Sequence, residues 1–415
     1  MVPNRRLYHI YAIIFIDVVV GSAIGPILPE FVKGYTNPQL WLALGTGLFL
    51  GMQLFSAPLL GKLSDGYGRR PIFIVSSIGT FLADCLLLPV RLGTQLANRF
   101  SDGLTNGMYA TVRSAITDIS PKEDLFKNLG MEGAILSLGF VIGPAVSGLL
   151  LTVVDAANNG VASNAEQARL VVIMAVILSL VNILLSWTLR ETHPNPPGIS
   201  TQELKAELVN SLNVHTLWSR LLQKDRQYQT EGAVGLKKLV IMQLFLTLST
   251  GYYFYFVTFA SFGDLHMSAK SISYFFMYFG ALSVVINFIF YTYLADRINQ
   301  LRGILWLAAL GAPVLAGYGL VGTSMLSLYV LVTIDCLTLS LIQGLIEGLM
   351  AQQTSDDDRG EIFGINQALQ GVASFGTTLV FGGLSVLDLR LPFAWFGVCL
   401  AMVAVLAGHV QRVRL

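Results

Sequence analysis

Charged residues are scarce in this sequence of 415 residues, where aspartate, glutamate, lysine and arginine together make up only 12%. Soluble globular domains carry about 25% charged residues. Hydrophobic residues make up 54% of the chain, and its formal net charge is +1. A chain so close to neutral offers no basic surface for nucleic acid. So little charge predicts a membrane protein.

The sequence also has little from which to build a metal centre or an active site. Its three cysteines, Cys85, Cys336 and Cys399, stand singly inside apolar runs, and its five histidines are scattered. This pattern favours unpaired thiols within the membrane over disulfides or metal ligands. The sequence has no G-x-x-x-x-G-K-[ST] phosphate loop and no H-E-x-x-H motif. We therefore expect no metal, no cofactor, no enzymatic activity and no transport driven by ATP.

Long apolar runs take the place of charge. A membrane-spanning helix needs about 20 mostly apolar residues. Lipid offers the backbone no hydrogen-bond partners, so every such run should be helical. We predict an all-α membrane protein with twelve transmembrane helices, at residues 8–30, 39–61, 71–90, 94–118, 127–153, 168–189, 238–263, 270–294, 301–321, 325–352, 360–386 and 390–410.

Lysine and arginine are distributed unevenly between the connections of these runs. If the N-terminus is cytoplasmic, nineteen of the 26 lie in cytoplasmic connections and tails and five in outer connections. This bias follows the positive-inside rule. We expect a multi-pass protein of a bacterial inner (plasma) membrane with both termini in the cytoplasm.

The longest polar stretch, residues 190–237, divides the chain into residues 1–189 and 238–415. Leucines at helical spacing within it predict an amphipathic helix on the cytoplasmic surface. The sequence LSDGYGRR after the second run has a counterpart, LADRINQLR, after the eighth. Duplicated six-helix halves with a substrate site between them are common in secondary transporters. We predict two pseudo-symmetric six-helix bundles, joined by a linker that is either a tether or a regulatory element.

Residues 61–70 read GKLSDGYGRR and place four charged residues and three glycines between two apolar runs. The arginines alone could serve only to fix the topology. That interpretation leaves Asp65 and the glycines unexplained, whereas glycine permits a tight turn and a close approach of helices.

Four stretches together resemble the major facilitator superfamily. GKLSDGYGRR resembles the signature between its second and third spans, NRFSDGLTNG its fourth-span arginine pattern and GFVIGPAVSG its fifth-span antiporter motif. FIDVVVGSAIGPILP resembles the first span of twelve-span drug:proton antiporters, tetracycline exporters included. The resemblance covers the whole chain and is sharper in the first half. The matching residues are Gly61, Leu63, Asp65, Gly68, Arg69 and Arg70; Arg99, Gly103 and Gly107; Gly139, Gly143, Pro144 and Gly148; and Asp17, Pro26 and Pro29.

The resemblance implies alternating access, in which two halves rock about a central site. It implies that the loop with Asp65 and Arg69 latches the halves on the cytoplasmic side when the cavity opens outward. The antiporter motif is linked in the family to export in exchange for protons. Its glycines also give a thin, bendable helix face, which we expect to pack against a helix of the second half.

Eight charged residues fall inside the predicted spans and away from the span ends; a charge at the bilayer centre costs about 2.5–3.5 kcal/mol on insertion scales. Asp17, in the middle of the first span, is our leading proton carrier, although an acid that only supports helix packing remains an alternative. We interpret Asp84 as a packing acid and Glu132 as an interhelical or gate contact. The eight residues are Asp17, Asp84, Arg99, Asp102, Arg113, Glu132, Asp335 and Glu347.

The fourth span carries a polar stripe that should face a central cavity. Arg99 and Asp102 are one turn apart and could pair, and the resemblance implies that Arg99 takes part in proton coupling. Arg113 either binds an anionic substrate group or pairs with an acid of the second half. The stripe consists of Arg99, Asp102, Asn106, Tyr109 and Arg113.

Polar and aromatic residues of the second half complete the predicted substrate cavity. Asp335, Gln343 and Glu347 in the tenth span could accept a cationic substrate, hold a second proton or support the structure. Aromatic residues recur at helical spacing in the seventh span and predict either a wall for a lipophilic cation or ordinary packing. These are Tyr252, Tyr255 and Phe259.

Together these features predict proton-coupled antiport, the export of a small amphipathic compound or drug. The expected partners are that substrate, protons and the lipid bilayer, with no nucleic acid, and the expected state is a monomer powered by a proton gradient. Proton-coupled uptake of an organic anion or metabolite through Arg99 and Arg113 is one alternative. A membrane receptor or scaffold that transports nothing is another.

Overall fold

The computed structural model describes residues 5–106, 108–157, 163–193, 196–228, 234–290, 293 and 297–414, and these residues form helices without any strand. They form two compact units. The first unit consists of residues 1–209 and 267–280, and the second of residues 210–266 and 281–415. The division therefore falls inside the predicted linker, between the seventh and eighth predicted spans, and within the eighth predicted span.

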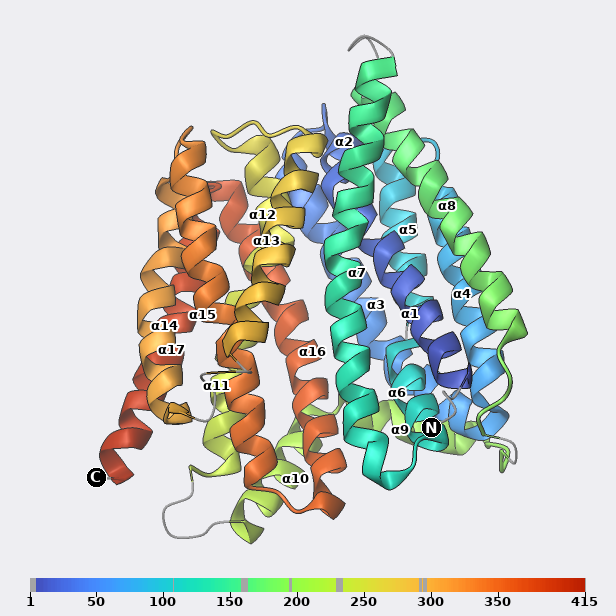
Figure 1. Ribbon diagram of the computed structural model, residues 1–415, viewed down its shortest axis with the longest axis vertical. Coiled ribbons are helices and arrows are strands. Elements are labelled where there is room, and N and C mark those ends of the chain that lie inside the picture. Colours follow the sequence, from blue (N-terminus) through green and yellow to red (C-terminus); the bar gives the residue numbers. More distant parts are fainter. Residues whose placement is uncertain are drawn as a thin grey trace. The chain divides into compact units, whose positions relative to one another are not determined.

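Ten helical elements of the first unit run from the N-terminus into the linker (Figure 1). The last of them, α9, crosses the unit boundary between Val209 and Asn210. They are α1 (Arg5–Ile24), η1 (Gly25–Ile27), α2 (Pro29–Val32), α3 (Pro38–Tyr67), α4 (Arg69–Leu86), α5 (Leu92–Thr105), α6 (Met108–Ile119), α7 (Lys122–Ala157), α8 (Asn164–Thr188) and α9 (Thr201–Leu212).

The second unit begins with a linker helix and continues with the remaining long helices. One helix, α13 (Ala269–Ile289), is shared, because its residues up to Gly280 pack in the first unit. The others are α10 (Val214–Gln227), α11 (Leu236–Thr250), α12 (Tyr252–Phe262), α14 (Gln300–Gly317), η4 (Tyr318–Leu320), α15 (Met325–Gln352), α16 (Asp356–Leu387) and α17 (Leu391–Arg414). Residues 294–296 of the LADRINQLR counterpart lie outside the described residues.

Ten helical segments among the described residues are long and apolar enough to span a membrane. The two other predicted spans, residues 71–90 and 94–118, are also helical but shorter or more polar. The former is α4, which has 18 residues and begins with two arginines; the latter is divided between α5 and α6. In Figure 1 both run among the longer helices of their unit. The all-α membrane fold is confirmed.

The local sequence explains where two of the helices begin. At α8, the Ser163 hydroxyl accepts the Glu166 N–H at 3.3 Å, and the Glu166 carboxylate accepts the Ser163 N–H at 2.8 Å. This reciprocal capping box satisfies two of the N–H groups that a helix start leaves unpaired. At α3, Pro38 begins the helix, where its missing N–H costs nothing.

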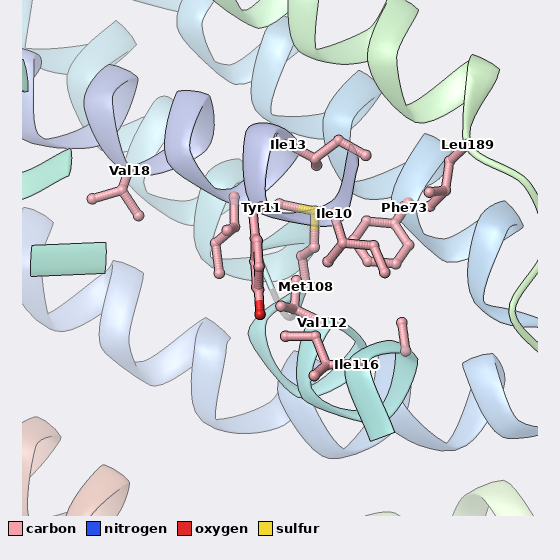
Figure 2. Close-up of a cluster of buried hydrophobic side chains, with 11 residues drawn as sticks. Ile10, Tyr11, Ile13, Val18, Phe73, Met108, Val112, Ile116 and Leu189 are labelled. Atoms are coloured by element: carbon pink, nitrogen blue, oxygen red, sulfur yellow. The ribbon is translucent and has the colours of Figure 1, made fainter. Parts of the chain in front are cut away.

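A cluster of buried apolar side chains fixes α1 within the first unit (Figure 2). Ile10, Ile13 and Ile14 of α1 are completely buried and pack with Phe73 of α4 and with Met108 and Val112 of α6. Val18 belongs to the cluster, and Tyr109 packs against it. The cluster therefore sets the position of α1 relative to α6, the two helices that carry Asp17 and Tyr109.

Candidate functional site

Asp17 meets Tyr109 at the buried face between α1 and α6. The Asp17 side chain is 5% exposed, and its Oδ2 accepts a hydrogen bond from the Tyr109 hydroxyl at 3.4 Å. The structure therefore brings together a residue of the first predicted span and one of the predicted polar stripe.

The polar stripe is divided because the fourth predicted span is not one continuous helix. Asn106 follows α5 with φ −86° and ψ 38°, outside the helical region, and α6 begins at Met108. Arg99 and Asp102 thus lie on α5, and Tyr109 and Arg113 on α6. Gly107, a member of the expected motif, lies outside the described residues.

No ion pair joins Arg99 to Asp102 within the described part of the chain. The Arg99 guanidinium instead lies over the Phe49 ring of α3, 5.7 Å from its centroid. Asp102 Oδ1 accepts a hydrogen bond from the Thr80 hydroxyl of α4 at 3.4 Å. α5 approaches α3 closely at Gly103, where a β-carbon would lie 2.8 Å from Met52 Cβ.

Arg113 pairs with an acid of its own unit, Glu132 on α7. The Nε to Oε1 distance is 3.3 Å, with side-chain exposures of 55% for Arg113 and 2% for Glu132. The alternative that Arg113 pairs with an acid of the second half stays a prediction. The pairing does not test whether Arg113 binds an anionic substrate. Asp84, interpreted as a packing acid, accepts a hydrogen bond from Ser179 of α8 at 2.5 Å.

The GKLSDGYGRR stretch forms the turn between α3 and α4. Gly68, with φ +99°, stands between the two helices, in a conformation that favours glycine. The Arg69 side chain donates to Asp118 at 2.9 Å and to Ser64 at 2.6 Å, and it forms an ion pair with Asp65. Arg70 donates to the Trp187 carbonyl at 2.8 Å. We call Ser64, Asp65, Arg69 and Asp118 the Arg69 cluster.

The antiporter motif on α7 packs mainly against α1. A β-carbon on Gly139 would lie 2.8 Å from Val18 Cγ1, and one on Gly143 would lie 2.6 Å from the Val19 carbonyl. Pro144 lies inside α7. Only Gly148 faces a helix that follows the linker, with its β-carbon position 3.1 Å from Ser273 Cβ on α13. The expected packing against the second half is thus found at Gly148 and not at the other two glycines.

In the second unit, Asp335 is enclosed by tyrosines. Its side chain is 1% exposed. Oδ2 accepts hydrogen bonds from Tyr318, at 3.0 Å, and from Tyr252, while Oδ1 is buried without a partner. Gln343 and Glu347, further along α15, bond to each other at 3.1 Å. The structure therefore separates Asp335 from the other two polar residues of its span.

The aromatic residues of α12 serve packing and also line a cavity. Tyr255 donates to the Leu389 carbonyl at 2.7 Å, and the Phe259 ring lies 4.7 Å from that of Phe393. Phe259, with Phe262, also lines a cavity of about 360 Å³ in the second unit. Acidic residues Asp264 and Asp388 border it. No cluster of metal ligands occurs among the described residues.

A family comparison assigns the chain to a group of transporters. The model described as "Major Facilitator Superfamily" matches residues 10–378. The chain belongs to the Major Facilitator Superfamily. This membership confirms the predicted family and places the chain among transporters rather than enzymes.

Three known proteins show the extent of the similarity. The class H tetracycline resistance protein of Pasteurella multocida is 33% identical over 35% of this chain and 38% of its own length. The class E protein of Escherichia coli is 31% identical over 50% and 49%. The chain thus matches half or less of these relatives' length. The structure of the human organic anion transporter MFSD10 covers 98% of this chain and 100% of its own, with a TM-score of 0.66 and 16% identity, which shows the shared fold.

Several partners that complete these clusters were not predicted from the sequence. Asp118 and Ser64 were not predicted as hydrogen-bond partners of the Arg69 side chain. Glu191, which accepts the Arg69 N–H at 2.8 Å, was not predicted as a site residue. Spacing of three or four residues reveals partners on one helix, such as Asp65 and Arg69. It gives no signal for Asp118 or Glu191, which lie far along the chain from Arg69.

Proposed function

We propose that the protein is a secondary active transporter that exports a small amphipathic compound or drug in exchange for protons. Family membership and the two tetracycline resistance proteins support export. The observation that carries the proposal is the Asp17 carboxyl, 5% exposed in α1 with a tyrosine hydroxyl as partner. An acid inside a spanning segment is expensive and typical of proton pathways.

In the proposed cycle, the two halves rock so that a central site faces each side of the membrane in turn. A proton from outside binds Asp17 and displaces the substrate; release of the proton inside lets the next substrate bind. Arg99 and Asp102 support this exchange, and the Arg69 cluster closes the cytoplasmic side while the site is open outward. The proton gradient drives the cycle without a cofactor.

The proposal includes the setting of the protein. It acts as a monomer in a bacterial inner membrane, with both termini in the cytoplasm. The excess of lysine and arginine on one set of connections supports this orientation.

The proposal is tested with the full chain in lipid vesicles under an imposed pH gradient, with tetracycline as the first substrate. Tetracycline should move opposite to the protons. Asp17→Asn should abolish movement driven by the gradient and keep part of the exchange of substrate for substrate. Asp84→Asn, which changes another buried acid with a hydroxyl partner, is the matched control and should keep gradient-driven movement.

Two results would contradict the proposal. Substrate flux without proton counterflow would reject the coupling, and unchanged gradient-driven flux in Asp17→Asn would remove Asp17 from the mechanism. If tetracycline does not bind, a thermal-shift screen of drugs and metabolites at two pH values supplies the substrate for the same measurement.

A second candidate function is proton-coupled uptake of an organic anion. The observation that favours it is the Arg113 guanidinium, whose side chain is 55% exposed beside the buried Glu132. An anion that raises the unfolding temperature of the protein, but not that of Arg113→Gln, would favour uptake over export of a cationic drug.

A further inference from the structure

Glu191, just beyond the end of α8, reaches the turn between α3 and α4. Its Oε1 accepts the backbone N–H of Arg69 at 2.8 Å, and its Oε2 accepts that of Arg70 at 3.0 Å. These N–H groups begin α4 and have no partner within the helix. They also lie at the positive end of the helix dipole, where a carboxylate is favoured. Glu191 therefore caps α4 from a distant part of the chain.

The same carboxylate also organises the start of the linker. Its Oε1 accepts the N–H groups of Thr192 at 2.9 Å and His193 at 3.0 Å. Gly68 makes room for it, because a β-carbon there would lie 2.6 Å from Oε2. One side chain thus joins the linker to the turn.

A second attachment lies a few residues further along the linker. The Gly198 N–H donates to the Gly66 carbonyl at 3.1 Å. A β-carbon on Gly66 would lie 2.7 Å from Ile199 Cβ, so the linker touches the backbone of the turn directly. The turn is therefore covered by the linker at both Gly66 and Arg69.

These contacts act on the Arg69 cluster. Glu191 holds the backbone of Arg69, while Asp118, Ser64 and Asp65 hold its side chain. Thr192 adds a hydrogen bond from its hydroxyl to Asp118 at 3.5 Å. If the start of the linker moved, Arg69 would therefore move relative to the side chains that bond to it.

We propose that Glu191 is a positioning residue for the Arg69 cluster and fastens the start of the linker to it. This role of Glu191 rests on the proposed function only where the test measures transport. In Glu191→Gln the side chain keeps its size, but its amide nitrogen cannot accept an N–H. The variant therefore loses acceptors for the start of α4 or for the linker.

The test uses a Thr192→Cys reporter in the full chain, with and without Glu191→Gln. Thr192 is 6% exposed, so its replacement should react slowly with a maleimide while the linker is attached. Loss of a charge-assisted hydrogen bond should raise the labelling rate roughly 10- to 100-fold. In vesicles, Glu191→Gln without the reporter should lower kcat and leave KM unchanged, because Glu191 lies outside the proposed substrate site.

Glu203→Gln is the matched control, because Glu203 also caps a helix in the linker. Its carboxylate accepts the Ser200 N–H at 3.0 Å at the start of α9, away from the Arg69 cluster. It should leave labelling and kcat unchanged. If Glu191 only stabilised the fold, Glu191→Gln would lower the unfolding temperature of the protein without a selective rise in the labelling rate of Thr192→Cys.

The proposal is overturned if Glu191→Gln labels Thr192→Cys at the unchanged rate, or if Glu203→Gln accelerates labelling equally. Labelling needs no substrate. Faster labelling in a protein that moves no substrate would support the role of Glu191 and reject the proposed transport, so the two failures are distinguishable.

Discussion

Three buried acids of the two units have hydroxyl groups as partners. Asp17 bonds to Tyr109, Asp84 to Ser179, and Asp335 to Tyr252 and Tyr318. A hydroxyl can donate to a carboxylate and can also accept from a protonated carboxyl. An arginine partner, in contrast, stays charged and favours the carboxylate. Hydroxyl partners therefore suit an acid that gains and loses a proton.

The surroundings of Asp335 lead to a prediction at a single position. In Asp335→Asn the amide oxygen can accept the same two tyrosine hydroxyls, so the free energy of unfolding should change little. Asp335→Leu removes the acceptor of both buried hydroxyls and should cost about 1–3 kcal/mol for each. Denaturant unfolding of the purified protein in detergent measures both. Equal destabilisation by the two variants would show that the stability depends on the negative charge.

At the scale of elements, the apolar runs predicted helices well, because length and hydropathy decide whether a segment can span lipid. The break at Asn106 was not predicted, since hydropathy does not detect a local departure from helical geometry. The site was predicted less completely. Asp65 and Arg69 were visible from their spacing, whereas the pairing of Arg113 with Glu132 depends on how α6 packs against α7.

The linker helix α10 shows how the polar stretch is attached to the second unit. Leu217 and Leu221 are buried, and Lys224 forms ion pairs with Asp358, at 2.8 Å, and Glu361, at 3.1 Å, near the start of α16. Figure 1 shows α10 at the ends of α11 and α16. The leucine spacing predicted one amphipathic helix, whereas the structure divides it at Asn213 into α9 and α10. The apolar side of α10 packs on protein.

Attachment of α10 should be insensitive to pH near neutrality. Hydrogen bonds from Lys224 and Tyr228 lower the pKa of Asp358, and those to Asp358 and Glu361 raise the pKa of Lys224. The contribution of Asp358 is lost only as the pH falls below about 4, and that of Lys224 only as it rises above about 10. Proteolysis of the linker at its basic residues should therefore be constant, relative to an unfolded standard, between about pH 5 and pH 9.

A substitution tests the same attachment. Lys224→Gln should speed hydrogen exchange in α10 by less than about tenfold, as expected for an exposed ion pair, whereas Lys205→Gln on α9 should have no effect there. Unchanged exchange in Lys224→Gln, or a change of proteolysis within the neutral range, would show that the apolar contacts alone hold α10.

At the scale of the whole molecule, α13 is a helix whose residues are divided between the two units. By sequence it belongs to the second half, yet residues 267–280 pack in the first unit. Lys270 forms an ion pair with Asp155 of α7, and the Tyr274 hydroxyl bonds to Thr152 at 2.8 Å. In the proposed cycle, contacts between α7 and a helix of the second half have to break and re-form each time.

Gly148 and Ser273 offer a direct test of that motion. The β-carbon position of Gly148 lies 3.1 Å from Ser273 Cβ, so after a small shift a disulfide between cysteines at these two positions fits the usual Cβ separation of about 3.5–4.5 Å. In Gly148→Cys/Ser273→Cys, an oxidant should stop transport in vesicles, and a reductant should restore it. The two single variants and the unaltered chain, whose own cysteines are Cys85, Cys336 and Cys399, should keep their rates under the same oxidant. Full transport by the cross-linked protein would mean that α7 and α13 stay together throughout the cycle, and the rocking of the two halves would then have to be abandoned.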